Sequence, residues 1–196
     1  MRMRRAIWIG GGLLATALAV TALLLWQSDR SAKPDDLSRF AVGAIETLET
    51  GPETPPTPDY AFIDAEGRSV TLADFRGRVV VLNAWAMWCP PCREEMPTLQ
   101  ALQAAYPPDQ VLVLPVNVDH ADDGIAAARV FIAEHNLPFY GDRRFQLPFE
   151  LPGGNAMPRT VIIGADGRIR AWMKGGAEWN SAEARALVDA VVADER

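Results

Sequence analysis

Apolar residues along the chain follow three patterns, and the first is a long run that carries no charge. Residues 7–26 are rich in Leu, Ala and Val and include no Asp, Glu, Lys or Arg. As an α-helix, a run of this length reaches about 30 Å, the thickness of a bilayer's hydrocarbon core. Arginines at positions 2, 4 and 5 precede it, and such charges favour the cytoplasmic side. The pattern predicts a transmembrane anchor at 7–26 behind a cytoplasmic N-terminus at 1–6.

A cleaved signal peptide is the alternative interpretation of this run, because Ala17-Leu18-Ala19 fits a small-x-small cleavage site. Residues 23–26 continue the apolar run where a polar flank would follow a cleaved peptide, which favours the anchor. The sequence thus predicts a single-pass protein of the cytoplasmic (inner) membrane, with its catalytic domain on the periplasmic side.

The second pattern is a helical spacing of apolar residues between two polar stretches. Residues 27–36 are polar and charged, and residues 51–58 include four prolines, which predict an extended linker. Between them, apolar residues recur at helical spacing and predict a short amphipathic helix. They are Leu37, Phe40, Ala41, Ala44, Ile45 and Leu48. Residues 27–59 are therefore predicted to form a stalk and linker with a short helix, and the folded domain is predicted at 60–196.

The third pattern, after residue 60, alternates short apolar runs with segments of helical periodicity. Continuous apolar runs at 79–83 and 111–118 predict buried strands. Glu66-Gly67 and Asp166-Gly167 each separate two short apolar segments, so each predicts a hairpin. Helices are predicted near 91–106, 124–135 and 181–192. This alternation of strands and helices is typical of an α/β domain.

The chain contains only two cysteines, Cys89 and Cys92, which lie where the strand at 79–83 leads into the next helix. A structural disulfide between residues three apart closes too small a loop to stabilise a fold much. A structural zinc site needs four ligands, and the two histidines, His120 and His135, have no motif spacing. The pair is therefore predicted to exchange disulfides, with capture of a soft metal as the alternative.

The position of the pair predicts different roles for its two sulfurs. Cys89 is predicted to lie exposed at the helix N-terminus, where backbone N–H groups and the helix dipole favour a thiolate. Cys92 lies one turn further, where it could attack a mixed disulfide held on Cys89. One Cys-x-x-Cys within this order of elements predicts a thioredoxin-like α/β fold, a central mixed sheet flanked by helices, behind one N-terminal transmembrane helix.

The charge balance narrows the range of partners. The net charge is -6 at pH 7, and three of the basic residues precede the anchor, so the exported part is more acidic still. Such a domain is a poor nucleic-acid binder. In an oxidising compartment, a dithiol is either an oxidant or a reductant that a dedicated donor keeps reduced.

Several motifs stand in a characteristic order along the chain. They are Phe62-x-Asp64-x-x-Gly67, Leu72-x-x-Phe75-x-Gly77, the stretch 83–97 around Trp88-Cys89-Pro90-Pro91-Cys92, Met157-Pro158-x-Thr160, and Gly176 with Glu178 and Trp179. Over about residues 60–192, the sequence resembles membrane-anchored, thioredoxin-like thiol:disulfide interchange proteins of the TlpA type (the TlpA/ResA/CcmG-like family). The resemblance implies that Cys89 attacks, that Cys92 resolves, and that Pro158 is a cis proline facing the disulfide.

The resemblance also indicates which residues contact a substrate. A cis bond at Pro158 would let Met157 offer backbone groups to a substrate strand lying beside Cys89. Trp88, Pro90 and Pro91 border the same place and are predicted to contact substrate as well.

A proton-transfer role for Glu95 also follows from the resemblance. Glu95 lies three residues after Cys92 on the same helical face, so its carboxylate can approach the resolving sulfur. Partial burial would raise the pKa of this carboxyl and let it exchange a proton with Cys92. Glu94 is predicted to face solvent. The alternative is that both acids only complement the helix dipole.

Four further residues receive predictions of their own. Asn83 is a neutral amide where generic thioredoxins carry a buried aspartate, so any proton relay should depend on Glu95. Trp85 is predicted to lie in the core. His120 and His135 are predicted to be loop and helix-end residues without a catalytic role.

Pro90 and Pro91 indicate the direction of electron flow. Neither has an N–H, so two donors that could stabilise a Cys89 thiolate are missing. A less stabilised thiolate makes a less oxidising disulfide, which favours a reductant. The resemblance implies oxidised clients in cytochrome biogenesis, either copper-centre assembly proteins of an oxidase or apocytochrome c. It also implies a membrane electron donor of the DsbD/CcdA type, and neither a cofactor nor a metal is predicted.

Two other functions remain open at this point. One is an oxidase that donates its disulfide to folding proteins. The other is a Cu(I)-binding chaperone that uses both sulfurs, with His135 as the one plausible additional ligand. A peroxidase is disfavoured because the sequence lacks Pro-x-x-x-Thr-x-x-Cys.

Overall fold

The computed structural model describes residues 36–51, 54–154 and 156–194. The predicted cytoplasmic N-terminus, the anchor at 7–26 and residues 27–35 of the stalk lie outside the described residues. Within the described ranges, no helix combines the length and the apolar character needed to cross a bilayer.

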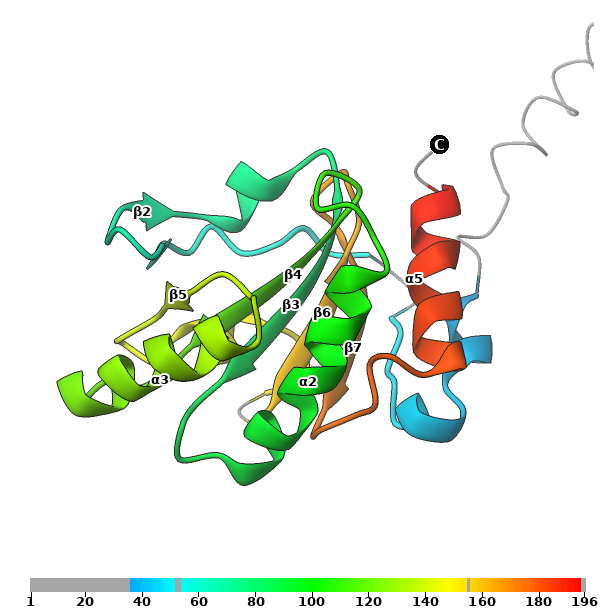
Figure 1. The fold of residues 1–196 in the computed structure, drawn as a ribbon. Helices are drawn as coiled ribbons and strands as arrows, with labels where there is room; N and C mark the ends of the chain where they lie inside the picture. Colours follow the sequence, from blue (N-terminus) through cyan, green and yellow to red (C-terminus); the bar gives the residue numbers. More distant parts are fainter. Residues whose placement is uncertain (1–35, 52–53, 155, 195–196) are drawn as a thin grey trace, which may run out of the picture. The chain divides into compact units, whose positions relative to one another are not determined.

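A mixed sheet forms the centre of the domain, as predicted (Figure 1). In the described part of the chain it has seven strands in the order β2-β1-β5-β4-β3-β6-β7. Strand β3 pairs in parallel with β4 and antiparallel with β6. The strands are β1 Phe62–Ile63, β2 Ser69–Val70, β3 Val79–Trp85, β4 Val111–Asn117, β5 Tyr140–Gly141, β6 Arg159–Ile163 and β7 Ile169–Lys174. Both predicted hairpins are confirmed, because β1 pairs with β2 and β6 with β7.

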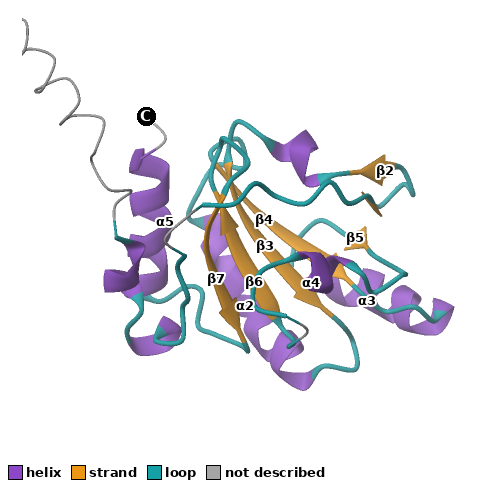
Figure 2. Ribbon diagram, turned by 180° about the vertical axis from the view of Figure 1, so that it is seen from behind, coloured by secondary structure: helices purple, strands orange, loops and turns teal. Residues whose placement is uncertain are grey.

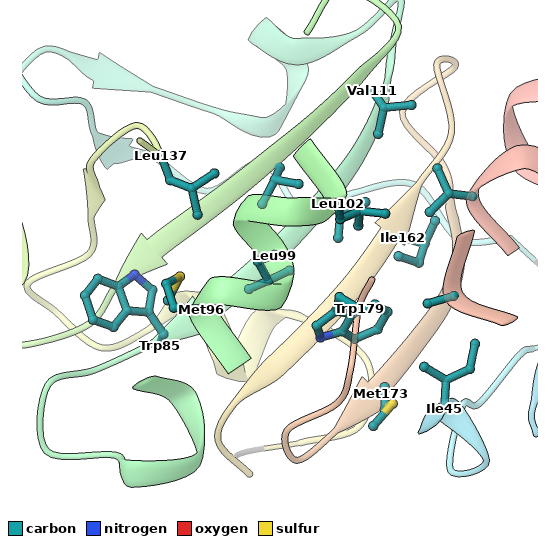
Figure 3. Close-up of a cluster of buried hydrophobic side chains, with 14 of the residues drawn as sticks. Ile45, Trp85, Met96, Leu99, Leu102, Val111, Leu137, Ile162, Met173 and Trp179 are labelled. Atoms are coloured by element: carbon teal, nitrogen blue, oxygen red, sulfur yellow. The ribbon is translucent and has the colours of Figure 1, made fainter. Parts of the chain in front are cut away.

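Both faces of the sheet are covered, which explains why every residue of β3 and β4 is buried. The helices are α2 Pro90–Ala104, α3 Asp122–Glu134, α4 Leu147–Glu150 and α5 Ala182–Asp194 (Figure 2). Successive side chains of a strand point to opposite faces. Accordingly, Val79 and Val81 pack in one cluster with residues of α2, α3 and α5, and Figure 3 labels Met96, Leu99 and Leu102 of α2 within this cluster. Val80 and Leu82 pack in another cluster, with Phe62 of β1 and Leu147 of α4.

The segment at 37–48 differs from the single amphipathic helix that its spacing predicted. It forms two 3₁₀ turns, η1 Leu37–Phe40 and η2 Gly43–Ile45. Between them Val42 is extended and Gly43 has a φ of 57°, a left-handed conformation that interrupts a helix. Three of the predicted apolar residues are nevertheless buried in the core. They are Leu37, Ile45 and Leu48.

The start of the folded domain also differs from the prediction near residue 60. The compact unit begins at Leu37. Glu49 forms a β-bridge with Trp172, and Pro56 forms one with Arg168, so the proline-rich stretch lies along β7 instead of linking separate parts. Three short elements were not predicted from the apolar pattern: the 3₁₀ turn η3 Leu72–Phe75, the strand β5 and the one-turn helix α4.

Candidate active site

The two cysteines lie where β3 leads into α2, at one end of the central strands. Cys89 is the N-cap residue of α2, and Pro90 and Pro91 follow at the first two helical positions. Proline suits the first turn, because the N–H groups there have no partner within the helix. Cys89 and Cys92 form a disulfide with their Cα atoms 5.4 Å apart.

The exposure of Cys89 corrects the sequence prediction. Cys89 was expected to lie exposed, but only 4% of its surface is accessible, and Cys92 is fully buried. Both cysteines belong to the core cluster of α2, α3 and α5, and Met157 and Phe145 pack against that cluster. In the disulfide form, apolar neighbours therefore enclose the sulfurs, and the rim of the site consists of the exposed residues Trp88, Pro90 and Pro91.

The peptide bond between Met157 and Pro158 is cis, as the resemblance implied. It precedes β6, the strand that pairs with β3. Pro158 is buried, and its carbonyl accepts a hydrogen bond from the Gly175 N–H at 3.0 Å. Met157 is half-buried against the core cluster to which both cysteines belong. Two residues later, Arg159 pairs with Ala84 of β3, the strand that leads to Cys89.

Glu95 is the buried acid of the site, with only 3% of its surface exposed. Its Oε1 accepts a hydrogen bond from Asn83 Nδ2 at 2.8 Å. Its Oε2 accepts bonds from Trp179 Nε1 at 3.0 Å and from the Ala177 N–H at 3.1 Å. Burial raises the pKa of Glu95 to about 7, although these donors act in the opposite direction. A carboxyl with this pKa changes its charge near neutral pH, which the sequence analysis expected of it.

Asn83 connects Glu95 to the cis-proline strand. Its Nδ2 group also donates to Thr160 Oγ1 at 3.0 Å, two residues after Pro158. Its Oδ1 atom is buried and has no hydrogen-bond partner among the described residues. The amide that replaces the expected aspartate is thus a direct neighbour of Glu95, so the two residues form one polar unit.

A pocket lies beside Glu95. It has a volume of about 370 Å³ and is lined by Pro91, Glu95 and Gly176, among others. The neighbouring Glu94 is exposed, as predicted. The buried carboxyl of Glu95 therefore borders this pocket, next to the exposed Glu94.

Comparison with known proteins agrees with this geometry. Residues 55–172 match the family model described as the AhpC/TSA family. The chain belongs to that family. It is 30% identical over 132 residues to the thiol-disulfide oxidoreductase ResA of Bacillus thuringiensis subsp. konkukian, covering 66% of this chain and 72% of the relative. It is 32% identical to the thioredoxin-like protein YneN of Bacillus subtilis, covering 67% of this chain and 68% of that protein.

A solved structure also resembles this AhpC/TSA family member. The thiol:disulfide interchange protein DsbE from Chlorobium tepidum superposes with a TM-score of 0.60 at 29% identity, covering 74% of this chain and 98% of that one. The names of the relatives, the thioredoxin-like fold and the disulfide at a helix N-terminus all indicate the same activity. The chain is a thiol:disulfide oxidoreductase.

Asp119 is a site residue that the sequence analysis missed. It follows β4, and its Oδ2 accepts a hydrogen bond from the Met87 N–H at 2.8 Å and one from Asn117 Nδ2 at 2.7 Å. Asp119 thereby holds the loop that leads to the cysteines. One feature of the sequence could have indicated Asp119. It is an acidic residue just beyond the carboxyl end of β4, and β4 pairs in parallel with β3, the strand that leads to Cys89.

Arg159, the unspecified residue in Met157-Pro158-x-Thr160, was also missed. Its side chain is fully buried, and its guanidinium donates to the carbonyls of Pro152, Gly153 and Gly154 at 2.6–2.9 Å. It thereby fixes the loop that precedes the cis bond. No sequence pattern marks this residue, because an arginine in a strand is usually exposed.

The remaining predictions concern Trp85 and the histidines. Trp85 is fully buried and packs against Phe131, as predicted. His120 is exposed in the loop after β4, and His135 ends α3 with its Nδ1 2.8 Å from the Phe131 carbonyl. Among the described residues, no group of three or more His, Cys, Asp or Glu side chains could hold a metal ion.

Proposed function

We propose that the protein acts as a reductant of disulfides in client proteins. The observation that carries this proposal is the pair of prolines at the first two positions of α2. A helix N-terminus normally offers several N–H groups to an anion, and here Pro90 and Pro91 remove two of them. A Cys89 thiolate is then stabilised less, so the dithiol gives up its electrons more readily.

The proposed reaction proceeds in two exchanges. Cys89 attacks a sulfur of the client disulfide as a thiolate, a bond forms between these sulfurs, and the client's other sulfur leaves as a thiolate that takes a proton. Cys92 then loses its proton and attacks the Cys89 sulfur. The enzyme disulfide forms, the client's second sulfur leaves, and two electrons have passed to the client.

Glu95 is proposed to receive the proton that Cys92 loses. Its position three residues after Cys92 and its pKa of about 7 suit a group that accepts and releases a proton at neutral pH. The pocket beside Glu95 offers the route by which that proton reaches solvent. Asn83 is proposed to hold the carboxylate in place.

The cellular setting is proposed from the sequence. Residues 1–6 would remain in the cytoplasm, 7–26 would anchor the chain in the cytoplasmic membrane, and 27–36 would form a stalk, with the domain in the periplasm. A membrane donor of the DsbD/CcdA type would reduce the Cys89–Cys92 disulfide again. The clients are proposed to be oxidised proteins of cytochrome biogenesis, with copper-centre assembly of an oxidase favoured over cytochrome c maturation.

The reduction potential of the full-length chain in detergent tests the direction. We expect a value near or below about -270 mV after equilibration in dithiothreitol buffers, because thioredoxin, a reductant, lies there. Pro91→Ala restores one N–H at the second helical position and should make the potential about 30 mV less negative. A wild-type value near about -120 mV would overturn the proposal in favour of a disulfide donor.

A further inference from the structure

Three aromatic rings form a continuous chain beside the redox pair. The Trp88 ring meets the Phe145 ring edge-on at 6.1 Å between centroids, and Phe145 meets Phe149 in the same way at 5.6 Å. Trp88 is 55% exposed and Phe149 is 52% exposed, while Phe145 between them is half-buried. We call Trp88, Phe145 and Phe149 the aromatic ridge.

The backbone at Phe145 is held in an unusual conformation. Phe145 has a φ of 51°, in the left-handed region that bulky side chains avoid. Asp142, itself buried, holds the turn. Its carboxylate accepts hydrogen bonds from the N–H groups of Arg144, Gln146 and Leu147 at 2.7–3.1 Å. A bulky residue kept in a strained conformation by a buried acid indicates that the position of its ring matters.

The helix α4 presents Phe149 in a similarly fixed way. Leu147, Pro148 and Leu151 are buried, and both leucines belong to the core cluster with Val80 and Leu82. Phe149 belongs to the same turn and has a larger apolar side chain than either leucine, yet it is exposed to solvent. Exposed aromatic rings that adjoin one another mark a contact surface more often than isolated ones do.

The aromatic ridge is continuous with the place where a client must make contact. Trp88 directly precedes Cys89, and Phe145 packs against the core cluster that contains both cysteines. A sulfur of the client has to touch Cys89 for exchange to occur. The client residues on either side of that cysteine then lie over the protein surface around Cys89.

We infer that the aromatic ridge is a docking surface for an apolar segment of the client, next to the client's disulfide. Trp88 would contact the residues nearest the client cysteine, and Phe145 and Phe149 would cover aliphatic or aromatic side chains further along. This deepens the proposed function and rests on it for the reduction of protein disulfides. It predicts that the protein prefers clients in which the residues near the disulfide are apolar to clients in which they are polar.

Two synthetic peptides test this preference. They are identical except for a Leu-Phe or a Ser-Asn pair placed a few residues away from one cysteine, within reach of Phe145 and Phe149, and that cysteine forms a mixed disulfide with glutathione. The full-length reduced chain in detergent is mixed with each, and the second-order rate constant is followed by chromatographic release of the peptide thiol. We expect the apolar peptide to react about tenfold faster, because burying one large apolar side chain supplies that ratio.

The double variant Phe145→Asn/Phe149→Ala should abolish this preference, leaving the two rates within about twofold. Asparagine tolerates the left-handed backbone, so the turn held by Asp142 is retained. The control Val130→Ala removes an apolar side chain that is 63% exposed on α3 and should keep the preference. The control Val130→Ala should also reduce glutathione disulfide at the wild-type rate, and for the double variant the ratio of the two peptide rates is the readout.

Three outcomes would overturn the inference. In the first, the wild type reacts equally with both peptides, and in the second, the double variant retains the preference. In the third, sedimentation equilibrium shows a wild-type dimer that the double variant dissociates, because a second copy of the chain then occupies the aromatic ridge. If the proposed direction of electron transfer were wrong, the reduction potential would show it and the peptide preference would not. The two failures can therefore be told apart.

Discussion

At the scale of single residues, Glu95 combines two opposing influences on one carboxyl group. Burial favours its neutral form, whereas the hydrogen bonds from Asn83, Ala177 and Trp179 favour its anion. The Trp179 and Ala177 donors cannot reverse their role. If the Asn83 amide turned by about 180°, its oxygen could accept a hydrogen bond from the O–H of a neutral Glu95. Asn83 is thus a partner suited to both charge states of Glu95.

The pKa of Glu95 predicts a pH dependence of stability. Because its folded pKa of about 7 lies above the ordinary 4.5, the folded protein keeps a proton that the unfolded chain loses between these values. The stabilisation is complete below pH 4.5 and is lost as the pH rises through about 7. This loss corresponds to about 3 kcal/mol in the free energy of unfolding. Glu95→Gln should remove this dependence, as urea unfolding of the oxidised protein at pH 5 and pH 8 would measure.

Glu94→Gln is the matched control for this experiment, because Glu94 is adjacent but exposed. It should retain the wild-type difference between pH 5 and pH 8. The interpretation would be wrong if the difference survived in Glu95→Gln or disappeared in Glu94→Gln.

The redox pair and the acid proposed to serve it could be identified from the sequence, whereas the residues that hold them in place could not. Cys89 and Cys92 follow from residue type and spacing, and the role proposed for Glu95 follows from the resemblance. Asp119 and Arg159 act through contacts to backbone groups of other segments, and residue type does not reveal such contacts. The low exposure of Cys89 was missed for a related reason, since the residues that enclose it come from distant parts of the chain.

At the scale of elements, the loop between β3 and α2 depends on the neighbouring strand. The carboxyl ends of β3 and β4 lie side by side because the strands are parallel and Trp85 pairs with Asn117. Asp119, just beyond that end, therefore reaches the Met87 N–H. The loop that leads to Cys89 is therefore held in place by a residue that follows β4, a strand that carries no cysteine.

Asp119→Ala should loosen this loop while leaving the sheet intact. Losing the acceptor of a half-buried N–H costs about 1–3 kcal/mol, so the Met87 amide should exchange its hydrogen about tenfold faster or more. Reduction of insulin by the dithiol should slow in parallel. Asp119→Asn keeps an oxygen acceptor and serves as the control. Unchanged exchange of Met87 in the alanine variant would refute this role of Asp119.

The sequence predicted long elements better than short ones. Continuous apolar runs located β3 and β4, and helical periodicity located α2, α3 and α5 to within a few residues. The helix α4 and the strand β5 are too short to show a period. The break at Gly43 was missed because apolar spacing persists across the two 3₁₀ turns.

At the scale of the whole molecule, residues 37–59 complete the domain. Leu37, Ile45 and Leu48 fill the core beside α5. The Ala44 N–H donates to Glu183 at 2.7 Å, and Lys174 lies 3.0 Å from the Glu49 carboxylate. A segment that resembles a stalk in composition therefore covers one side of α5 and the edge strand β7.

A fragment that begins at Tyr60 should consequently be less stable than one that begins at Asp36. Removing the burial of Ile45 and Leu48 alone costs about 3–6 kcal/mol, since each side chain contributes about 1.5–3 kcal/mol. The midpoint of urea unfolding measures this difference. Ile45→Ala in the longer fragment should give an intermediate midpoint. Equal midpoints for the two fragments would show that the segment contributes nothing to the fold.

The amino-acid sequence was sufficient to predict the redox chemistry and the order of the long elements. Two cysteines three apart at a strand-to-helix boundary, and the period of the apolar residues, are local properties that neighbouring positions encode. Tertiary structure alone decided that Asn83 meets Glu95, that Asp119 holds Met87, that Arg159 fixes the loop before Pro158, and that Phe145 lies beside Trp88. These contacts join residues far apart in the chain. They depend on the order and register of strands in the sheet, which no local pattern specifies.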